Sequence, residues 1–151
     1  MKIKIYIKDI LVPVIIGGVV GLIISGSIDY NSLEKPPLAP PSIVFPIVWT
    51  IIYIIMGISY GMLKNENLVD SKTKWIYYIQ LLINALWSII FFTLKARLFA
   101  FIWIILLDIL VITMIIDFYK KKKVAGILQI PYLLWSLFAT YLNLGIYLLN
   151  R

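Results

Sequence analysis

Apolar residues occur along this chain in five long runs that charged residues separate. The runs cover about residues 8–28, 42–63, 75–94, 98–119 and 124–149. Each is close to or above the roughly 20 residues that an α-helix needs to cross the hydrocarbon core of a bilayer. Polar positions do not alternate with apolar ones, as they do in the strands of a membrane barrel. The pattern predicts an all-α integral membrane protein, a five-transmembrane-helix bundle in which residues 1–151 form one domain.

Composition supports this class and narrows the chemistry. Hydrophobic residues make up 62% of the chain and charged residues 14%, whereas a soluble domain is about 45–50% apolar. The chain has no cysteine and no histidine. This excludes disulfides, thiolate chemistry and imidazole-bound metals, and it removes the commonest general base. We therefore expect no metal site, no required cofactor and no conventional enzyme active site.

Basic residues are distributed unequally between the two sides of such a bundle. Ten fall on the side of the N-terminus, namely Lys2, Lys4, Lys8, Lys64, Lys72, Lys74 and Lys120 to Lys123. Four fall on the other side, namely Lys35, Lys95, Arg97 and Arg151. The positive-inside rule predicts a protein of the cell membrane with a cytoplasmic N-terminus and its C-terminus outside. Because the net charge of +7 is split among short loops, we expect the lipid bilayer and not nucleic acid as partner.

The connection between the first two runs, residues 29–41, is rich in proline. Five of the seven prolines lie between Pro36 and Pro46. Proline lacks a backbone donor and fixes φ, so this segment is not an ordinary helix interior. It predicts a stiff, extended connector that leads into Trp49, and we interpret it as the lid of a site.

The third run carries a polar stripe on one helical face. Gln80, Asn84, Trp87, Ser88 and Phe91 are spaced at i, i+4, i+7, i+8 and i+11, which puts them on one side of a helix. Lipid cannot satisfy an amide, so this face must point into the bundle. It is either a hydrogen-bonded seam between helices or a set of groups that orients a ligand in an apolar pocket. The spacing alone does not decide between these two interpretations.

Stripes of small residues on the first two runs allow two interpretations, close helix packing or dimerisation. Small residues recur at a spacing of four at Gly17, Gly21 and Ser25, and again at Gly57 and Gly61. Such stripes favour close packing within the bundle over dimerisation.

Asp108 is the only charged residue deep within a run. Intramembrane carboxyl groups are commonly functional. Asp108 is therefore either a proton carrier or a protonated packing residue that bonds to a neighbour.

Three motifs resemble the TspO/MBR family of tryptophan-rich sensory proteins, also called translocator protein or peripheral-type benzodiazepine receptor. The first is Leu33-Glu-Lys-Pro followed by Pro40-Pro41 and Phe45-Pro46-x-x-Trp49-Thr. The second is Gln80-x-x-x-Asn84-x-x-Trp87-Ser-x-x-Phe91-Phe92. The third is Ala125-x-x-Leu128-x-x-Pro131-Tyr132-x-x-Trp135-x-x-Phe138-Ala139-x-Tyr141-Leu142-Asn143. Together they cover nearly the whole chain in the order of five spans.

The resemblance implies a cavity that opens toward the first loop and binds tetrapyrroles such as protoporphyrin IX or haem, or benzodiazepine-type ligands. It also implies a homodimer. Matched by motif position, the ligand-binding residues would be Tyr30, Pro36, Trp49, Asn84, Trp87, Phe91, Trp135, Ala139, Leu142 and Asn143. The chain departs from the family pattern at Leu38 and Asp29, where aromatic residues are common.

These features support three functional hypotheses. The first is a sensor, regulator or translocator that binds planar tetrapyrroles, since Trp49, Trp87 and Trp135 offer flat apolar faces. Without histidine, metal-free porphyrin is expected to bind in preference to haem. The second, implied by the family, is light- and oxygen-dependent porphyrin breakdown with Trp49 or Trp135 as electron partner. The third is a proton-coupled transporter that uses Asp108.

Overall fold

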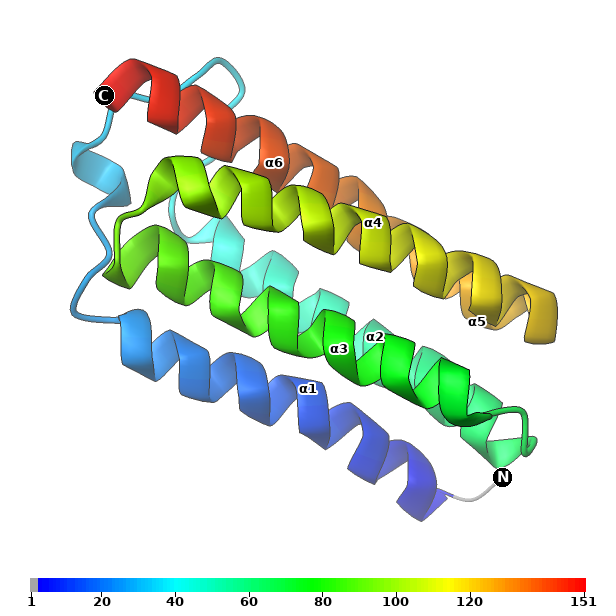
Figure 1. The fold of residues 1–151 in the computed structure, drawn as a ribbon. Coiled ribbons are helices and arrows are strands. Elements are labelled where there is room, and N and C mark those ends of the chain that lie inside the picture. The colour runs from blue at the N-terminus through cyan, green and yellow to red at the C-terminus, as the bar shows by residue number, and fades with distance from the viewer. Residues whose placement is uncertain (1–2) are drawn as a thin grey trace.

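The computed structural model describes residues 3–151, and side chains from Tyr6 onward. This part of the chain forms a bundle of long helices that run side by side (Figure 1). Within it, five helical segments are long and apolar enough to cross a membrane: Tyr6–Ile24, Val44–Asn65, Ser71–Thr93, Arg97–Lys121 and Lys123–Asn150. The predicted class, a five-helix membrane bundle, is confirmed.

The helix bounds differ from the predicted runs mainly at polar ends. In chain order the elements are α1 (Ile3–Ile24), η1 (Tyr30–Ser32), α2 (Val44–Asn65), α3 (Ser71–Ser88), η2 (Ile89–Thr93), α4 (Arg97–Lys121), α5 (Lys123–Leu128) and α6 (Ile130–Asn150). The first helix ends at Ile24 rather than at residue 28, and the third begins at Ser71 rather than at residue 75. Hydropathy marks only the apolar part of a helix, so it misses the polar first turn of α3. At α1 the turn Ser25-Gly26-Ser27 ends the helix before the apolar run ends.

Asp70 explains the early start of α3. Its carboxylate accepts a hydrogen bond of 2.8 Å from the backbone N–H of Thr73, which caps the helix. Lys121 donates to the other carboxylate oxygen across 2.8 Å. This hydrogen bond with Lys121, together with the cap, lowers the pKa of Asp70 well below its usual range. The cap therefore also ties the start of α3 to the end of α4.

The last span is broken into two helices at Gln129. α5 ends at Leu128 and α6 begins at Ile130, with Pro131 in its first turn. Proline fits the first turn of a helix because its missing N–H would have no partner there, whereas it disrupts a helix interior. Pro131 therefore lies at the start of a new helix, and Gln129 alone separates this helix from α5.

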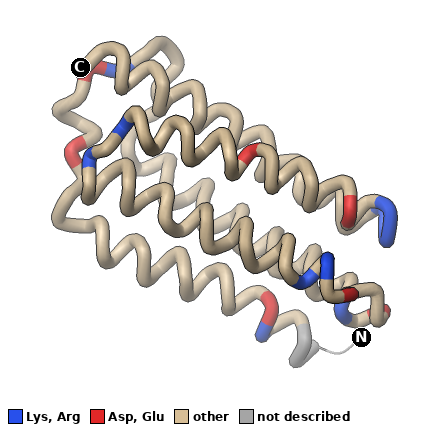
Figure 2. Tube along the Cα trace, viewed as in Figure 1, with Lys and Arg blue, Asp and Glu red and all other residues tan. Residues whose placement is uncertain are grey.

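Two clusters of buried apolar side chains fill the bundle, and the partly buried Ile16 and Phe92 pack against both. The main cluster joins side chains from α2, α3, α4, α5 and α6, including Tyr53, Tyr132 and Ile146. A smaller cluster joins Val20 and Ile24 of α1 to Ala85 of α3. Charged residues lie mainly at the two ends of the bundle (Figure 2). This distribution leaves a long apolar belt for the bilayer.

Glycines set how closely α1 approaches α2. A Cβ at Gly57 would lie 2.5 Å from the backbone of Asp9 and Ile10, and one at Gly17 would lie 2.4 Å from the ring of Tyr53. The spacing at Gly57 and Gly17 therefore serves packing within the bundle. Gly21 has nothing within 4 Å of its Cβ position. The stripe of small residues on α1 therefore packs against α2 at Gly17 but not at Gly21.

The proline-rich connector crosses the end of the bundle and is held against α6. The Pro36 ring occupies the space beside Gly145, where a Cβ would lie 2.5 Å from it. The hydroxyl of Tyr141 donates to the Pro37 carbonyl across 2.7 Å. The side-chain amide of Asn150 pairs with the backbone N–H and carbonyl of Glu34 at 3.0 and 2.8 Å. These contacts dock the connector over the C-terminal end of α6.

Candidate functional site

A cavity of about 630 Å³ lies between α1, α2, the α3–η2 segment and α6, next to the proline-rich connector. Its wall is mainly apolar and aromatic. The lining residues are Val14, Gly17, Gly18, Val20, Gly21, Ile24, Ile28, Tyr30, Ser42, Ile43, Phe45, Pro46, Trp49, Thr50, Tyr53, Trp87, Ser88, Phe91, Phe92, Ala139, Leu142, Asn143 and Ile146. This volume is within the range of about 300–1,000 Å³ that small-molecule sites occupy.

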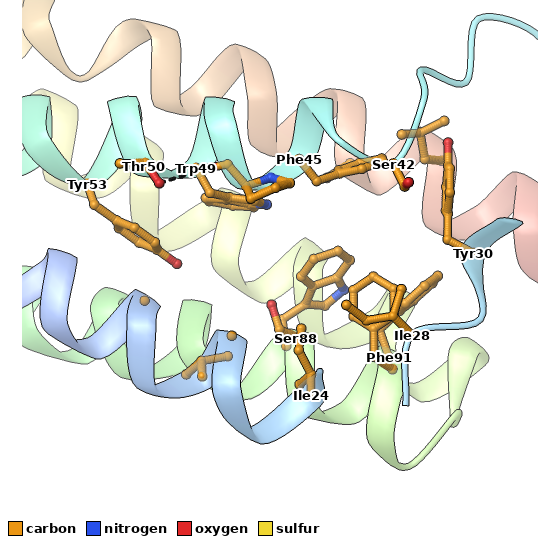
Figure 3. A pocket seen from close by; sticks show the side chains of 18 of the residues that line it. Ile24, Ile28, Tyr30, Ser42, Phe45, Trp49, Thr50, Tyr53, Ser88 and Phe91 are labelled. Atoms are coloured by element: carbon orange, nitrogen blue, oxygen red, sulfur yellow. Dashed lines mark hydrogen bonds between the residues drawn. The ribbon is translucent and has the colours of Figure 1, made fainter. Parts of the chain in front are cut away.

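Aromatic rings from two helices face each other across this cavity. Phe45, Trp49 and Tyr53 project from successive turns of α2, and Ser88 and Phe91 lie opposite (Figure 3). The rings of Trp49 and Tyr53 are stacked, with centroids 5.7 Å apart and planes at 24°. The arrangement offers flat, apolar surfaces of the kind that bind planar ligands.

The segment η2 shapes the wall opposite α2. Its turns are wider than those of an α-helix, as in the 3.0 Å hydrogen bond from the Leu94 N–H to the Ile89 carbonyl. A π-helical turn inserts an extra residue and changes the direction of the side chains that follow. Phe91 and Phe92 both line the cavity from this segment. The π-helical turn therefore sets the directions in which these two rings enter the cavity.

One polar contact crosses the cavity wall between α3 and α6. The Trp87 indole N–H donates to the side-chain oxygen of Asn143 across 2.9 Å. The Asn143 amide nitrogen donates in turn to the Arg97 carbonyl across 2.8 Å. Asn143 therefore positions Trp87 and the start of α4 at the same time.

A chain of hydrogen bonds starts at Tyr53 on the cavity wall and links α2, α3 and α6. The Tyr53 hydroxyl donates to Asn84 across 2.8 Å, and Asn84 donates to the Tyr132 hydroxyl across 2.7 Å. Tyr132 then donates to Gln80 across 2.7 Å. Gln80 and Asn84 therefore form the helix seam that the sequence allowed. Trp87, Ser88 and Phe91 line the cavity, and their role in orienting a ligand stays a prediction.

Most of the residues that the resemblance selected lie on the cavity wall. These are Tyr30, Trp49, Trp87, Phe91, Ala139, Leu142 and Asn143. Three do not line it. Pro36 packs on Gly145, Asn84 is in the seam, and Trp135 lies behind Trp49 with ring centroids 6.4 Å apart. Whether any of these residues contacts a ligand stays a prediction.

The sequence interpretation missed the contribution of α1. Gly18, Gly21 and Ile24 line the cavity, and a Cβ at Gly18 or Gly21 would meet nothing within 4 Å. Small residues leave room for a ligand as well as for a neighbouring helix. The adjacent glycines at 17 and 18 are the sequence signal for this wall, because a stripe with a spacing of four includes Gly17 but not Gly18.

Tyr30 connects the cavity to the connector. Its ring lines the cavity and meets the Phe45 ring edge-on at 5.0 Å. Its hydroxyl donates to the Pro40 carbonyl across 2.6 Å. Partial burial raises the pKa of Tyr30, so the hydroxyl stays protonated and remains a donor. The connector is therefore anchored from within the cavity.

Asp108 lies outside the cavity, on the face of α4 that packs on α6. Its carboxylate accepts hydrogen bonds from the hydroxyls of Ser136 and Thr140. The Thr140 hydroxyl oxygen also lies 2.9 Å from the Ser136 carbonyl oxygen, which is a second acceptor for its single proton. Asp108 therefore has partners of its own, and it is not among the cavity-lining residues.

The fold and the cavity define a multi-pass helical membrane protein with an aromatic site inside the bundle. The chain belongs to the TspO/MBR family, whose model matches residues 10–149. The identification from the three sequence motifs is therefore confirmed.

Individual relatives support the same assignment. The chain is 44% identical over 122 residues to the tryptophan-rich protein TspO of Archaeoglobus fulgidus, covering 80% of this chain and 79% of that protein. It is 34% identical over 150 residues to a translocator protein homolog of Schizosaccharomyces pombe, covering 93% and 88%. It is 30% identical over 118 residues to the translocator protein of Ovis aries, covering 76% and 70%.

Proposed function

We propose that this protein binds planar, hydrophobic tetrapyrroles in the cavity, with protoporphyrin IX as the reference ligand, and acts as a sensor or translocator. The observation that carries the proposal is the aromatic lining of the cavity. Trp49 and Tyr53 on α2 and Trp87 and Phe91 on the α3–η2 segment line an apolar space of about 630 Å³. The names of the relatives, tryptophan-rich sensory protein and translocator protein, agree with a role of this kind.

The polar groups of the wall fit a ligand held mainly by its flat faces. Trp87 and Asn143 bond to each other and to the backbone, so they rigidify the wall. Thr50 donates to the Pro46 carbonyl within its own helix across 2.7 Å. Affinity would then come mostly from apolar area buried between rings.

A matched pair of glycine variants tests the proposal. A Cβ at either Gly21 or Gly26 meets nothing within 4 Å, but only Gly21 lines the cavity. Protoporphyrin IX is titrated into protein in phosphatidylcholine nanodiscs, and saturation is followed by the shift of the Soret band. Wild type and Gly26→Leu are expected to saturate, whereas Gly21→Leu weakens binding at least tenfold because its side chain fills the space. Equal saturation by all three proteins, or none above empty nanodiscs, would refute the site.

A second function, light-driven oxidation of bound porphyrin by oxygen, is favoured by the surroundings of Trp49. Four aromatic rings have centroids within 6.5 Å of its own, those of Tyr53, Trp87, Tyr132 and Trp135. An indole would give an electron to the excited ring, and oxygen would take that electron up as superoxide, which then attacks the ring. The aromatic cluster can share the oxidised state left on the indole. Illumination under oxygen should bleach porphyrin faster in wild type than in Trp49→Phe. Trp75→Phe, at an exposed position outside the cavity, is the control.

A further inference from the structure

A charged cluster adjoins one end of the cavity. Ile28, Tyr30 and Phe91 lie together at this end (Figure 3). Asp29 stands between two of these lining residues in the chain. The guanidinium carbon of Arg97 is 5.1 Å from the centroid of the Phe91 ring. The cluster of Asp29, Lys95 and Arg97 is therefore in contact with the wall.

The hydrogen bonds within this cluster are incomplete. One terminal nitrogen of Arg97 contacts both carboxylate oxygens of Asp29, at 2.7 and 2.8 Å. The Nε of Arg97 is buried and has no partner among the described residues. The Lys95 ammonium nitrogen lies 3.8 Å from a carboxylate oxygen of Asp29, which is too far for a hydrogen bond, and the Lys95 side chain is 53% exposed. Two cations thus share one anion, and donors remain free.

The position of Arg97 is fixed from inside the cavity. Asn143 lines the cavity and donates to the Arg97 carbonyl across 2.8 Å. The side chain of Arg97 is only 12% exposed. A cation held in such a site interacts with an anion more strongly than a cation in bulk water does. The cluster of Asp29, Lys95 and Arg97 carries one more positive than negative charge, and a purely apolar ligand would not interact with this excess charge.

We propose that Lys95 and Arg97 form a carboxylate-binding subsite at this end of the cavity. The apolar ring system of a ligand would occupy the aromatic part, and an acid group on its edge would bind the two cations in competition with Asp29. This inference rests on the proposed tetrapyrrole binding and names the residues that would hold the acid edge of the ligand. Charge-assisted hydrogen bonds from guanidinium and ammonium groups suit this partner.

The test compares protoporphyrin IX with its dimethyl ester, which has the same ring but no free acid. Both are titrated into wild-type protein in phosphatidylcholine nanodiscs, with empty nanodiscs to subtract partition into lipid. Asp29→Asn removes the competing charge. Lys95→Asn removes one cation and suits the positive φ of 54° at this position. Arg97→Gln removes the other cation, and Lys74→Gln, exposed at the opposite end of α3, is the matched control.

We expect wild type to bind the diacid more tightly than the diester. Asp29→Asn should tighten diacid binding about threefold to tenfold and leave the diester unchanged. Lys95→Asn should weaken the diacid about threefold, and Arg97→Gln about tenfold. Lys74→Gln should bind both ligands as wild type does.

Each other outcome counts against a defined part of the argument. If both compounds bind saturably with equal affinity and no variant separates them, the subsite is wrong and the cavity proposal stands. If neither binds above empty nanodiscs, the proposed function fails and the subsite fails with it. Should Arg97→Gln not fold, the exposed Lys95→Asn and the isosteric Asp29→Asn still decide the question.

Discussion

Trp87 donates its indole N–H to the side-chain oxygen of Asn143 across 2.9 Å and so joins α3 to α6 on the cavity wall. Interhelical hydrogen bonds in membrane proteins average about 0.6 kcal/mol and reach about 1.7 kcal/mol. Asn143 makes a second bond to the Arg97 carbonyl, so its removal affects two contacts.

We expect Asn143→Ala to lower the free energy of unfolding by about 1–3 kcal/mol and Trp87→Phe by about 1 kcal/mol. The double variant should lose less than the sum, because the two changes remove the same hydrogen bond. The free energy of unfolding of wild type, the two single variants and the double variant is measured by reversible unfolding in mixed micelles with increasing amounts of a denaturing detergent. Strict additivity would contradict a direct bond between the two side chains.

Gly57 and Gly18 make a matched test of packing between α1 and α2. A Cβ at Gly57 would lie 2.5 Å from the backbone of α1, whereas one at Gly18 would meet nothing within 4 Å. Gly57→Ala should therefore destabilise the protein by about 1–3 kcal/mol, since backbone cannot move aside as a side chain can. Gly18→Ala should be neutral or stabilising by up to about 1 kcal/mol through helix propensity. Thermal unfolding in one detergent ranks them, and similar losses in both would disprove the contact.

Asp108 is expected to act in helix packing and not in binding. Asp108→Asn keeps an acceptor for Ser136 or Thr140 and should cost about 1 kcal/mol or less. Asp108→Leu leaves the buried Ser136 hydroxyl without this partner and should cost about 1–3 kcal/mol. Porphyrin affinity should be unchanged in Asp108→Asn, because Asp108 does not line the cavity. A changed affinity, or loss of proton-dependent porphyrin flux in vesicles, would revive the transporter hypothesis.

Leu38 occupies the left-handed region of backbone space, with φ of 73°, and its side chain is 84% exposed. This conformation costs a residue with a Cβ about 1–2 kcal/mol relative to glycine. Leu38→Gly should therefore raise the free energy of unfolding by about 0.5–1 kcal/mol after the entropy of the unfolded chain is counted. Leu33→Gly, where φ is −86°, should lower it. A loss of stability in both variants would show that the conformation at Leu38 is not strained.

The apolar runs predicted the number and order of the spans because hydrocarbon imposes one length and one backbone solution. The sequence also placed Trp87 on an inward face, because this helix face carries the amides of Gln80 and Asn84, which lipid cannot satisfy. It did not show where along α3 the polar stripe changes from a hydrogen-bonded helix seam to a lining of the cavity. That point depends on Tyr53 and Tyr132, which reach Asn84 from two other helices. Partners so distant in the chain leave no periodic signal.

The π-helical segment at Ile89–Thr93 was also beyond prediction. Four of its five residues are apolar, and the segment fits an α-helix equally well, so only tertiary packing selects the wider turn. The role of α1 was missed for a related reason. Glycine spacing indicates that something approaches closely, but it does not distinguish a helix, as at Gly57, from an open space, as at Gly21.

The two apolar clusters have a consequence for cooperativity, because few side chains join them. Val20 and Ile24 belong to the smaller cluster and line the cavity from one side, while Tyr53 and Trp87 of the main cluster line it from the other. Ile16 and Phe92 pack against both clusters. We expect the C-terminal half of α1 to open and exchange amide hydrogens before the main cluster does, as weakly coupled units do. A molecule that filled the cavity would touch both clusters and couple them more strongly, so amide exchange along α1 would report its binding without any label on the ligand.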